Sequence, residues 1–482
     1  MSKAIVKIMK YIDDYELVCG LEVHVELKTE TKIFCSCPTK FGAEPNTQCC
    51  PVCSGMPGAL PVLNRKVVEL AVKAGLALNC SITEYSHEDR KNYFYPDLPK
   101  AYQISQYDRP LCTGGYVDIL SDGTEKRIGI TRIHIEEDAG KLIHDGDRTL
   151  IDLNRCGVPL IEIVSEPDIR SPAEAAELAR KLRAILSTVG VSDCRMNEGS
   201  LRVDVNLSVR KRGEPFGTRC EIKNLNSFAF VEKAAEAEYK RQVELIKVGG
   251  IVVQETRRFD PSAKMTYSMR TKENANDYRY FPDPDLVCIH VSPQEVEAIR
   301  SSMPMLPDER KKMYIERYGL TLKDAEQMVS EKNLYGFFDR SVEKTKYPKL
   351  LANFILCDVL SMTDGEINIQ PDELSRTVDM FGDELINSST AKKLVKLLFE
   401  AAERGEKINV ERYINDNELW QINDHDLLDG YIKEVIDEER GLVEAYKSGK
   451  NGAMKAIMGK LMAKTGGKAN VKYISEAIYD FI

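Results

Sequence analysis

The chain has 482 residues, of which 43% are hydrophobic and 30% charged, as in a globular protein of about two to four domains. Its net charge of −9 argues against a protein coated in nucleic acid, although a local basic site remains compatible with that total. No stretch approaches the roughly 18 consecutive apolar residues of a membrane helix, and the N-terminus lacks a secretory signal, so we expect a cytoplasmic protein.

The first region, residues 15–290, mixes strand-like alternation with long loops and two well-signalled helices. The first helix is predicted over residues 171–190, with Ser171 as N-cap and a proline at the first helical position. The second is predicted over residues 226–250, where Ser227 opens the helix and two glycines close it. We expect both helices to cover the apolar side of a sheet.

The remainder of the chain is predicted to be helical. The helical periodicity continues past residue 409, but the charge pattern changes there, so we place a boundary at that point. The pattern before that boundary predicts helices over residues 295–301, 308–318, 322–330 and 347–360. The sequence therefore predicts three parts: residues 1–294 with an insertion at 35–53, residues 295–408, and residues 409–482.

Four predicted strands share one design, in which one face is apolar and the other is charged. In residues 17–27 the odd positions are all apolar, and the even positions include Glu22, His24 and Glu26. The charged faces of the other three strands carry Arg202, Asp204 and Asn206; Arg219, Glu221 and Lys223; and Arg132, His134 and Glu136. An antiparallel sheet with one solvated face would give this alternation without any function. Acidic residues are nevertheless poor strand formers, so their concentration here calls for a reason.

A divalent metal site would supply that reason, because Mg²⁺ prefers carboxylate oxygens together with substrate phosphates. Arg202, Arg219 and Lys223, interleaved with the acids, could bind phosphate oxygens and offset developing charge. The sequence contains neither a P-loop nor a dinucleotide-binding glycine motif. If ATP binds, we expect it to bind on this sheet for phosphoryl transfer.

Long, ordered motifs of the first region resemble those of the B subunits of tRNA-dependent amidotransferases. The matching stretches are residues 20–25, 90–100, 132–141, 152–155, 157–168, 198–202, 223–228 and 277–285. The match covers the first region almost continuously and the C-terminal part more loosely. The chain is identified as a member of that family on these motifs.

The resemblance implies an α+β fold. Residues 1–294 would form an antiparallel-sheet catalytic domain of the kind shared by glutamine synthetase and guanido kinases, residues 295–408 an all-helical domain, and residues 409–482 a small helical tail that binds tRNA. It also implies a metal and nucleotide constellation of Glu22, His24, Glu136, Glu137, Asp204 and Glu221. Strict alternation would turn Glu137 away from the others unless the strand ends or bulges there.

The reaction implied is that of a carbon–nitrogen ligase in protein biosynthesis. ATP phosphorylates the side-chain carboxylate of glutamate or aspartate misacylated onto tRNA(Gln) or tRNA(Asn), and ammonia then displaces phosphate. The chain has no cysteine-amidase or amidase-signature motif. The resemblance implies that a separate amidase, the A subunit of the amidotransferase, supplies the ammonia from glutamine, and that the small C subunit braces the pair. No DNA or membrane partner is expected.

Three alternatives remain open at this point. The archaeal glutamyl-specific E subunit shares the catalytic region but usually carries a large additional domain before the tail. A glutamine-synthetase-like ligase would act on free glutamate and would leave the lysine-rich tail without a purpose. A non-catalytic scaffold would bind tRNA, and its acidic sheet face would be solvent-exposed without a catalytic role. The loop that reads the tRNA acceptor end is also open, with residues 90–108 and 277–286 as candidates.

A cysteine cluster is typical of a structural zinc site. Cys35 and Cys37 form a C-x-C pair and Cys50 and Cys53 a C-x-x-C pair, and four thiolates satisfy tetrahedral Zn²⁺. In a reducing cytosol metal is favoured over a disulfide or a catalytic thiol. Some members of the family keep these four cysteines and bind zinc there, while others lack them. The additional Cys49 leaves the identity of the fourth ligand open.

The tail combines an apolar helical stripe with an excess of positive charge. The lysines expected to contact tRNA phosphates are Lys455, Lys460, Lys464, Lys468 and Lys472. A solvated helix face would give a similar pattern, but one sign of charge over about thirty residues favours phosphate contact in an acidic protein. Residues 464–470 resemble a turn of the family's tail domain, with Val471 where proline is usual.

Overall fold

The computed structural model describes residues 14–271, 277–363, 366–450 and 452–482. Its internal contacts divide the chain into two compact units, Met1–Pro307 and Asp308–Ile482. None of the helices in the described ranges combines the length and the hydropathy of a membrane-spanning segment.

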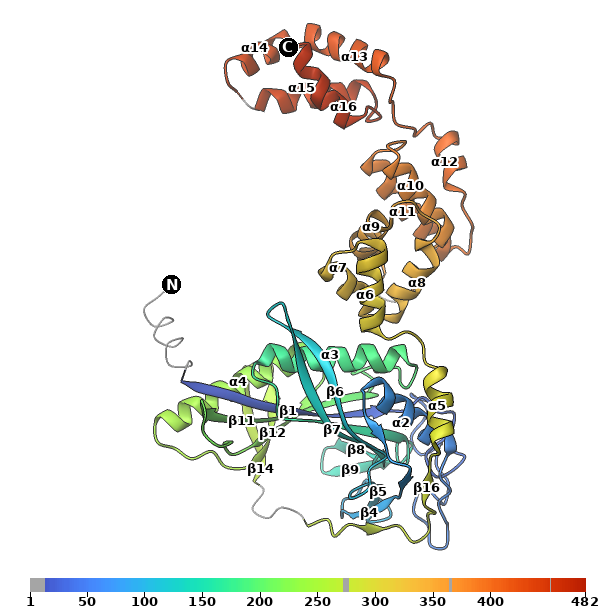
Figure 1. The fold of residues 1–482 in the computed structure, drawn as a ribbon, viewed down its shortest axis with the longest axis vertical. Coiled ribbons are helices and arrows are strands. Elements are labelled where there is room, and N and C mark those ends of the chain that lie inside the picture. Colours follow the sequence, from blue (N-terminus) through green and yellow to red (C-terminus); the bar gives the residue numbers. More distant parts are fainter. Residues whose placement is uncertain (1–13, 272–276, 364–365, 451) are drawn as a thin grey trace. The chain divides into compact units, whose positions relative to one another are not determined.

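A nine-stranded sheet organises the first unit (Figure 1). Its order is β14-β13-β12-β11-β1-β10-β7-β6-β2, and neighbours are antiparallel except for the parallel pair β12–β13. The strands are β1 (Tyr15–Glu26), β2 (Ser81–Ile82), β6 (Cys112–Ser121), β7 (Thr124–Glu137), β10 (Pro159–Ser165), β11 (Leu201–Lys211), β12 (Cys220–Leu225), β13 (Glu255–Asp260) and β14 (Met265–Thr271).

Helices α2 (Arg65–Ala77), α3 (Pro172–Thr188) and α4 (Phe228–Lys247) pack against this sheet. The two predicted helices, α3 and α4, are confirmed, and their N-caps Ser171 and Ser227 accept the backbone N–H groups expected of them. Helix α2 was not predicted. Its buried Val67, Val68, Leu70 and Val72 join the same core.

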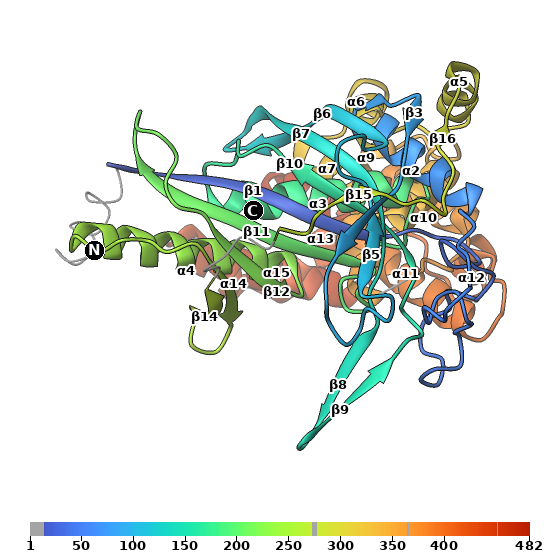
Figure 2. The same cartoon turned by 90° about the horizontal axis from the view of Figure 1, so that it is seen from below.

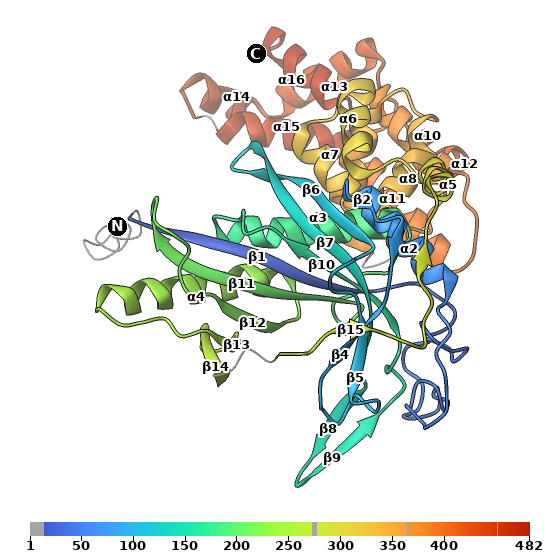
Figure 3. The same ribbon diagram turned by 60° about the horizontal axis from the view of Figure 1, so that its bottom comes forward.

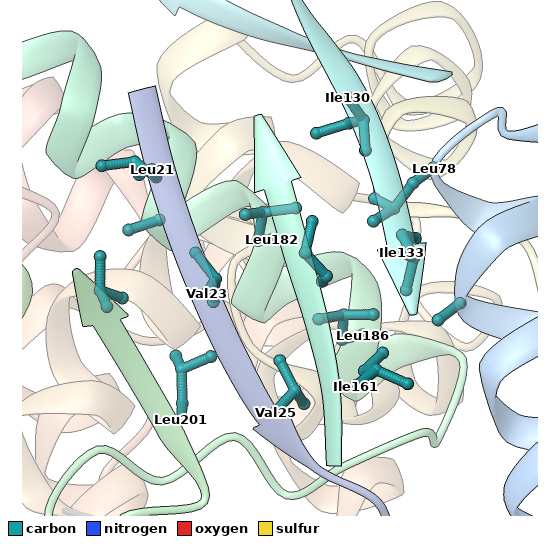
Figure 4. Packing of buried hydrophobic residues seen from close by; sticks show 14 of the residues in the cluster. Leu21, Val23, Val25, Leu78, Ile130, Ile133, Ile161, Leu182, Leu186 and Leu201 are labelled. Atoms are coloured by element: carbon teal, nitrogen blue, oxygen red, sulfur yellow. The ribbon is translucent and has the colours of Figure 1, made fainter. Parts of the chain in front are cut away.

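The core lies between the sheet and these helices. Figure 4 shows Leu21, Val23 and Val25 of β1 beside Ile161 of β10, with Leu182 and Leu186 of α3 packed against them. Because this face of the sheet is dry, the charged residues of the same strands are confined to the opposite face.

Strand β7 changes its alternation part-way along. Its pairing with β10 shifts register, so that Arg132 faces Val164 while Ile130 faces Ser165, and Thr131 is left as the additional residue of a β-bulge. The bulge lets Ile130 and Ile133 both point into the core, although they are three residues apart. Beyond it, Arg132, His134 and Glu136 take the open face.

Short strands extend the first unit beyond the main sheet (Figures 2 and 3). Three of them form a small sheet in the order β15-β4-β5, two form the pair β3–β16, and two form the hairpin β8–β9. Their bounds are β3 (Tyr85–Ser86), β4 (Asp89–Asn92), β5 (Tyr102–Ser105), β8 (Lys141–Asp145), β9 (Arg148–Asp152), β15 (Phe281–Pro282) and β16 (Ile289–His290). Helix α5 (Pro293–Ser301) contacts α2 and belongs to this first unit.

The second unit is helical in its described part. Its helices are α6 (Pro307–Tyr318), α7 (Leu322–Val329), α8 (Lys332–Val342), α9 (Pro348–Asn353), α10 (Pro371–Gly382), α11 (Ser388–Glu403), α12 (Val410–Asp416), α13 (His425–Glu438), α14 (Arg440–Lys447), α15 (Gly452–Lys464) and α16 (Val471–Ala477). The helix predicted over residues 347–360 is not continuous. After α9 the chain makes a π-helical turn, η1 (Phe354–Val359), which places Phe354, Ile355 and Val359 in the core.

Two separate hydrophobic clusters lie within the second unit, one extending from Tyr314 to Ile414 and the other from Leu428 to Ile478. The apolar stripe predicted in the tail contributes to the latter, with Ile457 and Leu461 fully buried. We keep the three-part division of the sequence, with boundaries after residues 294 and 408, as a proposal.

A buried ionic network holds α4 against β13 and β14. The carboxylate of Glu238, which has no exposed surface, accepts hydrogen bonds from Arg241 (2.6 Å) and Thr266 (2.7 Å) and pairs with Arg257 at 3.2 Å. Loss of the Glu238 charge would leave Arg241 and Arg257 to share the carboxylate of Glu255, so the buried positive charge would be under-compensated.

We expect Glu238→Gln to lower the free energy of unfolding of this region by about 3 kcal/mol, because Arg257 stays buried after losing a charged partner. Hydrogen exchange of amides in α4 and β13 measures this opening free energy. The matched control is Glu236→Gln on the same helix, which removes only an exposed pair with Lys240 and should cost less than about 1 kcal/mol.

The effect of Glu238→Gln should also depend on pH. Burial opposes the charged form, but hydrogen bonds from Arg241 and Gln242 hold the pKa of Glu238 below its ordinary value of 4.5. The carboxylate therefore stabilises the fold above pH 4.5, and this contribution is lost as the pH falls through the lower folded pKa. An equal difference between the two proteins at pH 7 and pH 3 would contradict the assignment.

Candidate active site

The open face of the sheet carries a row of charged side chains set by strand register. On adjacent strands β11, β1, β10 and β7, cross-strand pairing aligns Arg202 with His24, His24 with Glu162, and Glu162 with His134. One register step away, Asp204 lies opposite Glu22. Side chains directly opposite one another on the same face are close enough to interact.

Glu162 lies at the centre of this row. Its Oε2 atom is 3.4 Å from Nε2 of His24 and 3.6 Å from Nε2 of His134, which is itself 3.3 Å from Oε2 of Glu136. Two groups of candidate metal ligands share this carboxylate, Glu22–His24–Glu162 and His134–Glu136–Glu162, and within each group the ligand atoms lie within 4.8 Å of one another. Carboxylate oxygens and imidazole nitrogens at this spacing fit a divalent cation.

The sequence prediction did not include Glu162. It is the single acidic residue of β10, whose other positions are apolar except for Ser165, and strands buried on both faces have similar sequences. The signal that could have found it is this lone acid, 5% exposed, in the middle of an apolar strand that must pair with two acidic neighbours.

The pKa values of neighbouring groups in this row shift in opposite directions. Burial disfavours charge on Glu162, but the two histidines hold its pKa well below the usual range. Burial and the neighbouring Glu162 charge raise the pKa of Glu22 to about 7. For His24, burial is outweighed by the hydrogen bond and charge of Glu162, which raise its pKa to about 9. In the ion-free protein at neutral pH, His24 therefore carries a proton that a metal must displace, and Glu22 carries one in part.

Glu136 and Glu137, adjacent in sequence, point to different places. Glu136 accepts a hydrogen bond from Gln103 and lies 3.9 Å from the ammonium of Lys91. Glu137 instead accepts from Lys100 at 2.6 Å and from the backbone N–H of Ile104 at 2.8 Å. It lines a separate cavity of about 270 Å³, so the structure does not bring Glu137 together with the other expected ligands.

Asp204 and Glu221 meet at one cation. The ammonium of Lys223 donates to Asp204 at 2.6 Å and lies 2.8 Å from Glu221, which also accepts from the hydroxyl of Thr256. The two carboxylates thus share one positive charge beside the Glu162 row. If either carboxylate were removed, Lys223 would keep the other as its partner.

The three basic residues expected to bind phosphate are placed differently. Lys223 and Arg202 line the cleft described next, and Arg202 donates to Asp138 at 2.7 Å. Arg219 is exposed and lies outside β12, which begins at the next residue, Cys220, so the strand predicted to carry Arg219 starts later than expected.

A cleft of about 1020 Å³ lies over this part of the sheet. His24, Glu136 and Asp204 line it, and so do the basic side chains of Lys40, Lys141, Arg155, Arg202 and Lys223. Its size is that of a site for a nucleotide-sized ligand, and its acidic and basic linings could hold a cation and phosphate oxygens side by side.

The two loops that were candidates for reading an acceptor end lie side by side. Strand β15 pairs with β4, and the rings of Tyr107 and Tyr280 stack with centroids 4.4 Å apart. The ammonium of Lys91 lies 5.3 Å from the ring centre of Tyr278 as well as near Glu136. Aromatic faces able to stack on nucleotide bases therefore adjoin the acidic group.

The cysteine cluster has the geometry of a metal site. The four sulfurs of Cys35, Cys37, Cys50 and Cys53 lie within 4.8 Å of one another, and those of Cys50 and Cys53 are 4.0 Å apart. Tetrahedral Zn–S bonds of ~2.3 Å require sulfurs about 3.8 Å apart. Cys49 is outside the group, and its thiol donates to the carbonyl of Asn46. The hydrogen bond from Cys35 holds the pKa of Cys53 below its usual range, at about 4.

The five tail lysines are not equivalent. Lys460 pairs with Glu439 at 3.0 Å, Lys464 with Glu438 at 2.7 Å, and Lys472 with Glu384 at 3.0 Å. Lys455 is exposed and Lys468 half-buried. Exposed pairs of this kind contribute about 0–1 kcal/mol, so the ammonium groups can be released at small cost.

Comparison with known proteins identifies relatives over nearly the whole chain. Residues 17–297 match the GatB/GatE catalytic domain and residues 336–482 the GatB domain. The B subunit of the aspartyl/glutamyl-tRNA(Asn/Gln) amidotransferase from Caldicellulosiruptor saccharolyticus is 50% identical over 477 residues, which cover 96% of this chain and 98% of the relative. Its counterpart in Caldanaerobacter subterraneus is 51% identical over 472 residues, with coverage of 96% and 98%.

The chain belongs to the family of aspartyl/glutamyl-tRNA(Asn/Gln) amidotransferase B subunits. The family resemblance drawn from the sequence motifs is confirmed. Proteins of this family are components of a glutamine-dependent carbon–nitrogen ligase, so the chain is one component of an enzyme. Because the chain covers 98% of relatives named as B subunits, the comparison favours the B subunit over the larger E subunit.

The cysteine geometry predicts that Cys50→Ser will lower the zinc content of the purified protein from one ion per chain towards zero, because it removes one of four ligands. Metal analysis of the dialysed protein measures this. Cys49→Ser is the matched control, since the adjacent thiol lies outside the ligand group and its loss should leave zinc bound. Loss of zinc from the Cys49 variant alone would contradict this ligand set.

The protonation of Glu22 and His24 predicts that divalent-cation affinity rises with pH. Their pKa values are raised to about 7 and about 9, so an ion that binds them must displace protons, and fewer protons remain as the pH increases from 6 to 9. Titration with Mn²⁺ as a probe for Mg²⁺ measures the affinity. Glu22→Gln should flatten the dependence near pH 7, and an unchanged pH profile in that variant would contradict the assignment.

Proposed function

We propose that this chain uses ATP and Mg²⁺ to phosphorylate the side-chain carboxylate of glutamate or aspartate misacylated onto tRNA(Gln) or tRNA(Asn). Ammonia then attacks the activated carbonyl carbon, phosphate leaves, and the product is glutaminyl-tRNA or asparaginyl-tRNA. The relatives are named for aspartyl/glutamyl-tRNA(Asn/Gln) amidotransferase activity. The division of that transfer into a phosphorylation and an amidation step on this sheet is the proposal.

The observation that carries the proposal is the row of carboxylates and imidazoles around Glu162 beneath a cleft of about 1020 Å³. Glu22, His24, Glu136 and Glu162 would hold the cation. When bound, Mg²⁺ would neutralise charge on the phosphates of ATP as the terminal phosphoryl group is transferred.

The basic residues of the cleft have a complementary role. Arg202 and Lys223 each line the cleft with a carboxylate partner already in place, so both ammonium and guanidinium groups are positioned before phosphate arrives. Such prepositioned charge stabilises the transferring phosphoryl group without reorganisation. Asp204 and Glu221 are candidate ligands for a further cation. The roles expected for Arg219 and Glu137 stay predictions, and the contact of Glu137 with Lys100 favours a different use.

The proposed architecture follows the same reasoning. An open, mainly antiparallel sheet with helices on one face supports the proposed likeness to the catalytic domains of glutamine synthetase and guanido kinases. We propose that the stacked tyrosines of the 90–108 and 277–286 segments receive the acceptor end of the tRNA, and that the tail lysines contact its phosphates.

Ammonia requires a partner. We propose that it comes from the amidase, the A subunit of the amidotransferase, with the small C subunit completing the complex, in keeping with the relatives' designation as one component of an amidotransferase. We further propose that the cysteine cluster holds structural Zn²⁺, that the protein is cytoplasmic, and that it binds neither DNA nor membranes.

The experiment that tests the catalytic proposal measures phosphate release from ATP by the folded chain with Mg²⁺, ammonium and glutamyl-tRNA(Gln). Ammonium replaces the amidase. Release that depends on the misacylated tRNA, with glutaminyl-tRNA formed in equal amount, is expected. Glu22→Ala combined with Glu136→Ala should lower the rate by at least about 100-fold, because both remove charge from the proposed cation site.

The matched control is Glu177→Ala, which removes a half-buried carboxylate that pairs with Arg180 on helix α3, on the helix-covered side of the sheet, and should leave the rate unchanged. Full phosphate release by the Glu22/Glu136 double variant would contradict the cation site and favour a tRNA-binding scaffold. Phosphate release with free glutamate and no tRNA would instead favour a glutamine-synthetase-like ligase.

A further inference from the structure

Lys32 is a fully buried lysine that leads into the cysteine cluster. Its backbone N–H donates to the carbonyl of Cys37 at 2.9 Å, which fixes it to the first cysteine pair. Its ammonium donates to Sγ of Cys53 at 3.5 Å and to the carbonyl of Leu153 at 3.2 Å. One side chain thus joins both halves of the cluster to the loop before Gly157.

A buried ammonium requires an anionic partner, because water no longer solvates it. Within the described ranges of the chain, Lys32 has no carboxylate oxygen within 4.0 Å. A carbonyl offers a dipole but no charge. Of the two acceptors on Lys32, only the sulfur of Cys53 can supply a negative charge.

The other charges around Lys32 are already matched. Lys32 lines the cavity of about 270 Å³ together with Lys100, Arg90, Glu137 and Asp285. Lys100 is bonded to Glu137 at 2.6 Å, and Arg90 is bonded to Asp285 at 2.8 Å and to Asp283 at 2.7 Å. Each of these carboxylates is bonded to a cation other than Lys32, so the contact of Lys32 that can carry a negative charge is the sulfur of Cys53.

The cluster itself needs such a charge. Four thiolates around one Zn²⁺ carry a net charge of −2, and Cys53 is the most deeply buried of the four cysteines. Its sulfur already accepts the backbone N–H of Cys50 at 3.2 Å. The ammonium of Lys32 is a second donor to this sulfur, and it is the one that brings a full positive charge.

Gly157 lies beside Cys53 and the stem of Lys32. It has φ of +79°, and a Cβ at this position would lie 3.5 Å from Cβ of Cys53 and 3.8 Å from Cδ of Lys32. The loop that ends at Gly157 therefore packs directly on the lysine stem. This arrangement holds the ammonium between Cys53 and Leu153.

We propose that Lys32 is the counter-charge of the cysteine cluster, a positioning residue whose ammonium stabilises the Cys53 thiolate and slows loss of the metal. This inference rests on the proposed zinc site. Partners that surround metal ligands in this way commonly change metal affinity by about 10- to 100-fold.

The test uses the full chain with Lys32→Met, which keeps the length of the side chain and removes its charge. Zinc transfer to a chromophoric chelator should be about 10- to 100-fold faster or more complete than in the wild type. In the cobalt-substituted protein, the sulfur-to-cobalt charge-transfer band should move to longer wavelength, because the sulfur lone pairs lose a stabilising positive charge. Circular dichroism confirms that the variant is folded.

Two further variants separate charge from packing. Lys32→Arg keeps the charge and should restore slow zinc loss and the wild-type band. Lys28→Met removes an exposed lysine that pairs with Asp193, and it should behave as the wild type. A Lys32→Arg variant that behaves like Lys32→Met would show a packing role and overturn the inference.

Lys32→Met with wild-type zinc retention and an unshifted band would overturn the role of Lys32 while leaving the zinc site intact. A wild-type protein that binds neither zinc nor cobalt would reject the zinc site itself, and the inference with it. The two failures are distinguished by whether the wild type carries the metal.

Discussion

The register that places Glu162 between two histidines is the constraint on which the rest of the site depends. Antiparallel pairing of β10 with both β1 and β7 fixes His24 and His134 on either side of one carboxylate. A slip of one residue in either pairing would turn the acidic group into the core and the apolar residues into the cleft. The packing of the apolar face against the helices therefore also fixes which charged side chains lie side by side on the open face, because the same strand register places both sets of residues.

Period-two alternation was sufficient to predict one face for Glu22, His24, Arg202 and Asp204, because β1 and β11 are regular along their whole length. It could not predict the bulge at Thr131, which depends on how β7 fits its partner rather than on its own sequence. Glu162 was missed for a related reason. A lone acid in an apolar strand has meaning only once its neighbours across the sheet are known.

Helix signals were local and were therefore read correctly for α3 and α4, where an N-cap serine begins the helix and a glycine follows its end. The π-helical turn after α9 was not foreseen, since it reflects how Phe354, Ile355 and Val359 pack into the core rather than a signal in the segment itself. Spacing predicted the four-cysteine group, whereas the exclusion of Cys49 required the directions of the side chains. The segments 90–108 and 277–286 are held together by the Arg90–Asp283 contact and by the β4–β15 pairing. They lie almost two hundred residues apart in the sequence, so no local pattern could predict that they meet.

The carboxylates around the tail lysines bear on how the tail would respond to salt. Each phosphate that replaced Glu439, Glu438 or Glu384 beside a lysine would exchange one anion for another. The favourable contact of the lysine with phosphate would be offset because the released carboxylate would attract cations from solution. Fewer small ions would then be liberated overall than the number of lysines implies, and the affinity for a polyanion would fall less steeply with ionic strength than for a tail of unpaired lysines. Binding of tRNA by the tail, as proposed, would then owe its discrimination against competing RNA to shape and contact rather than to charge alone.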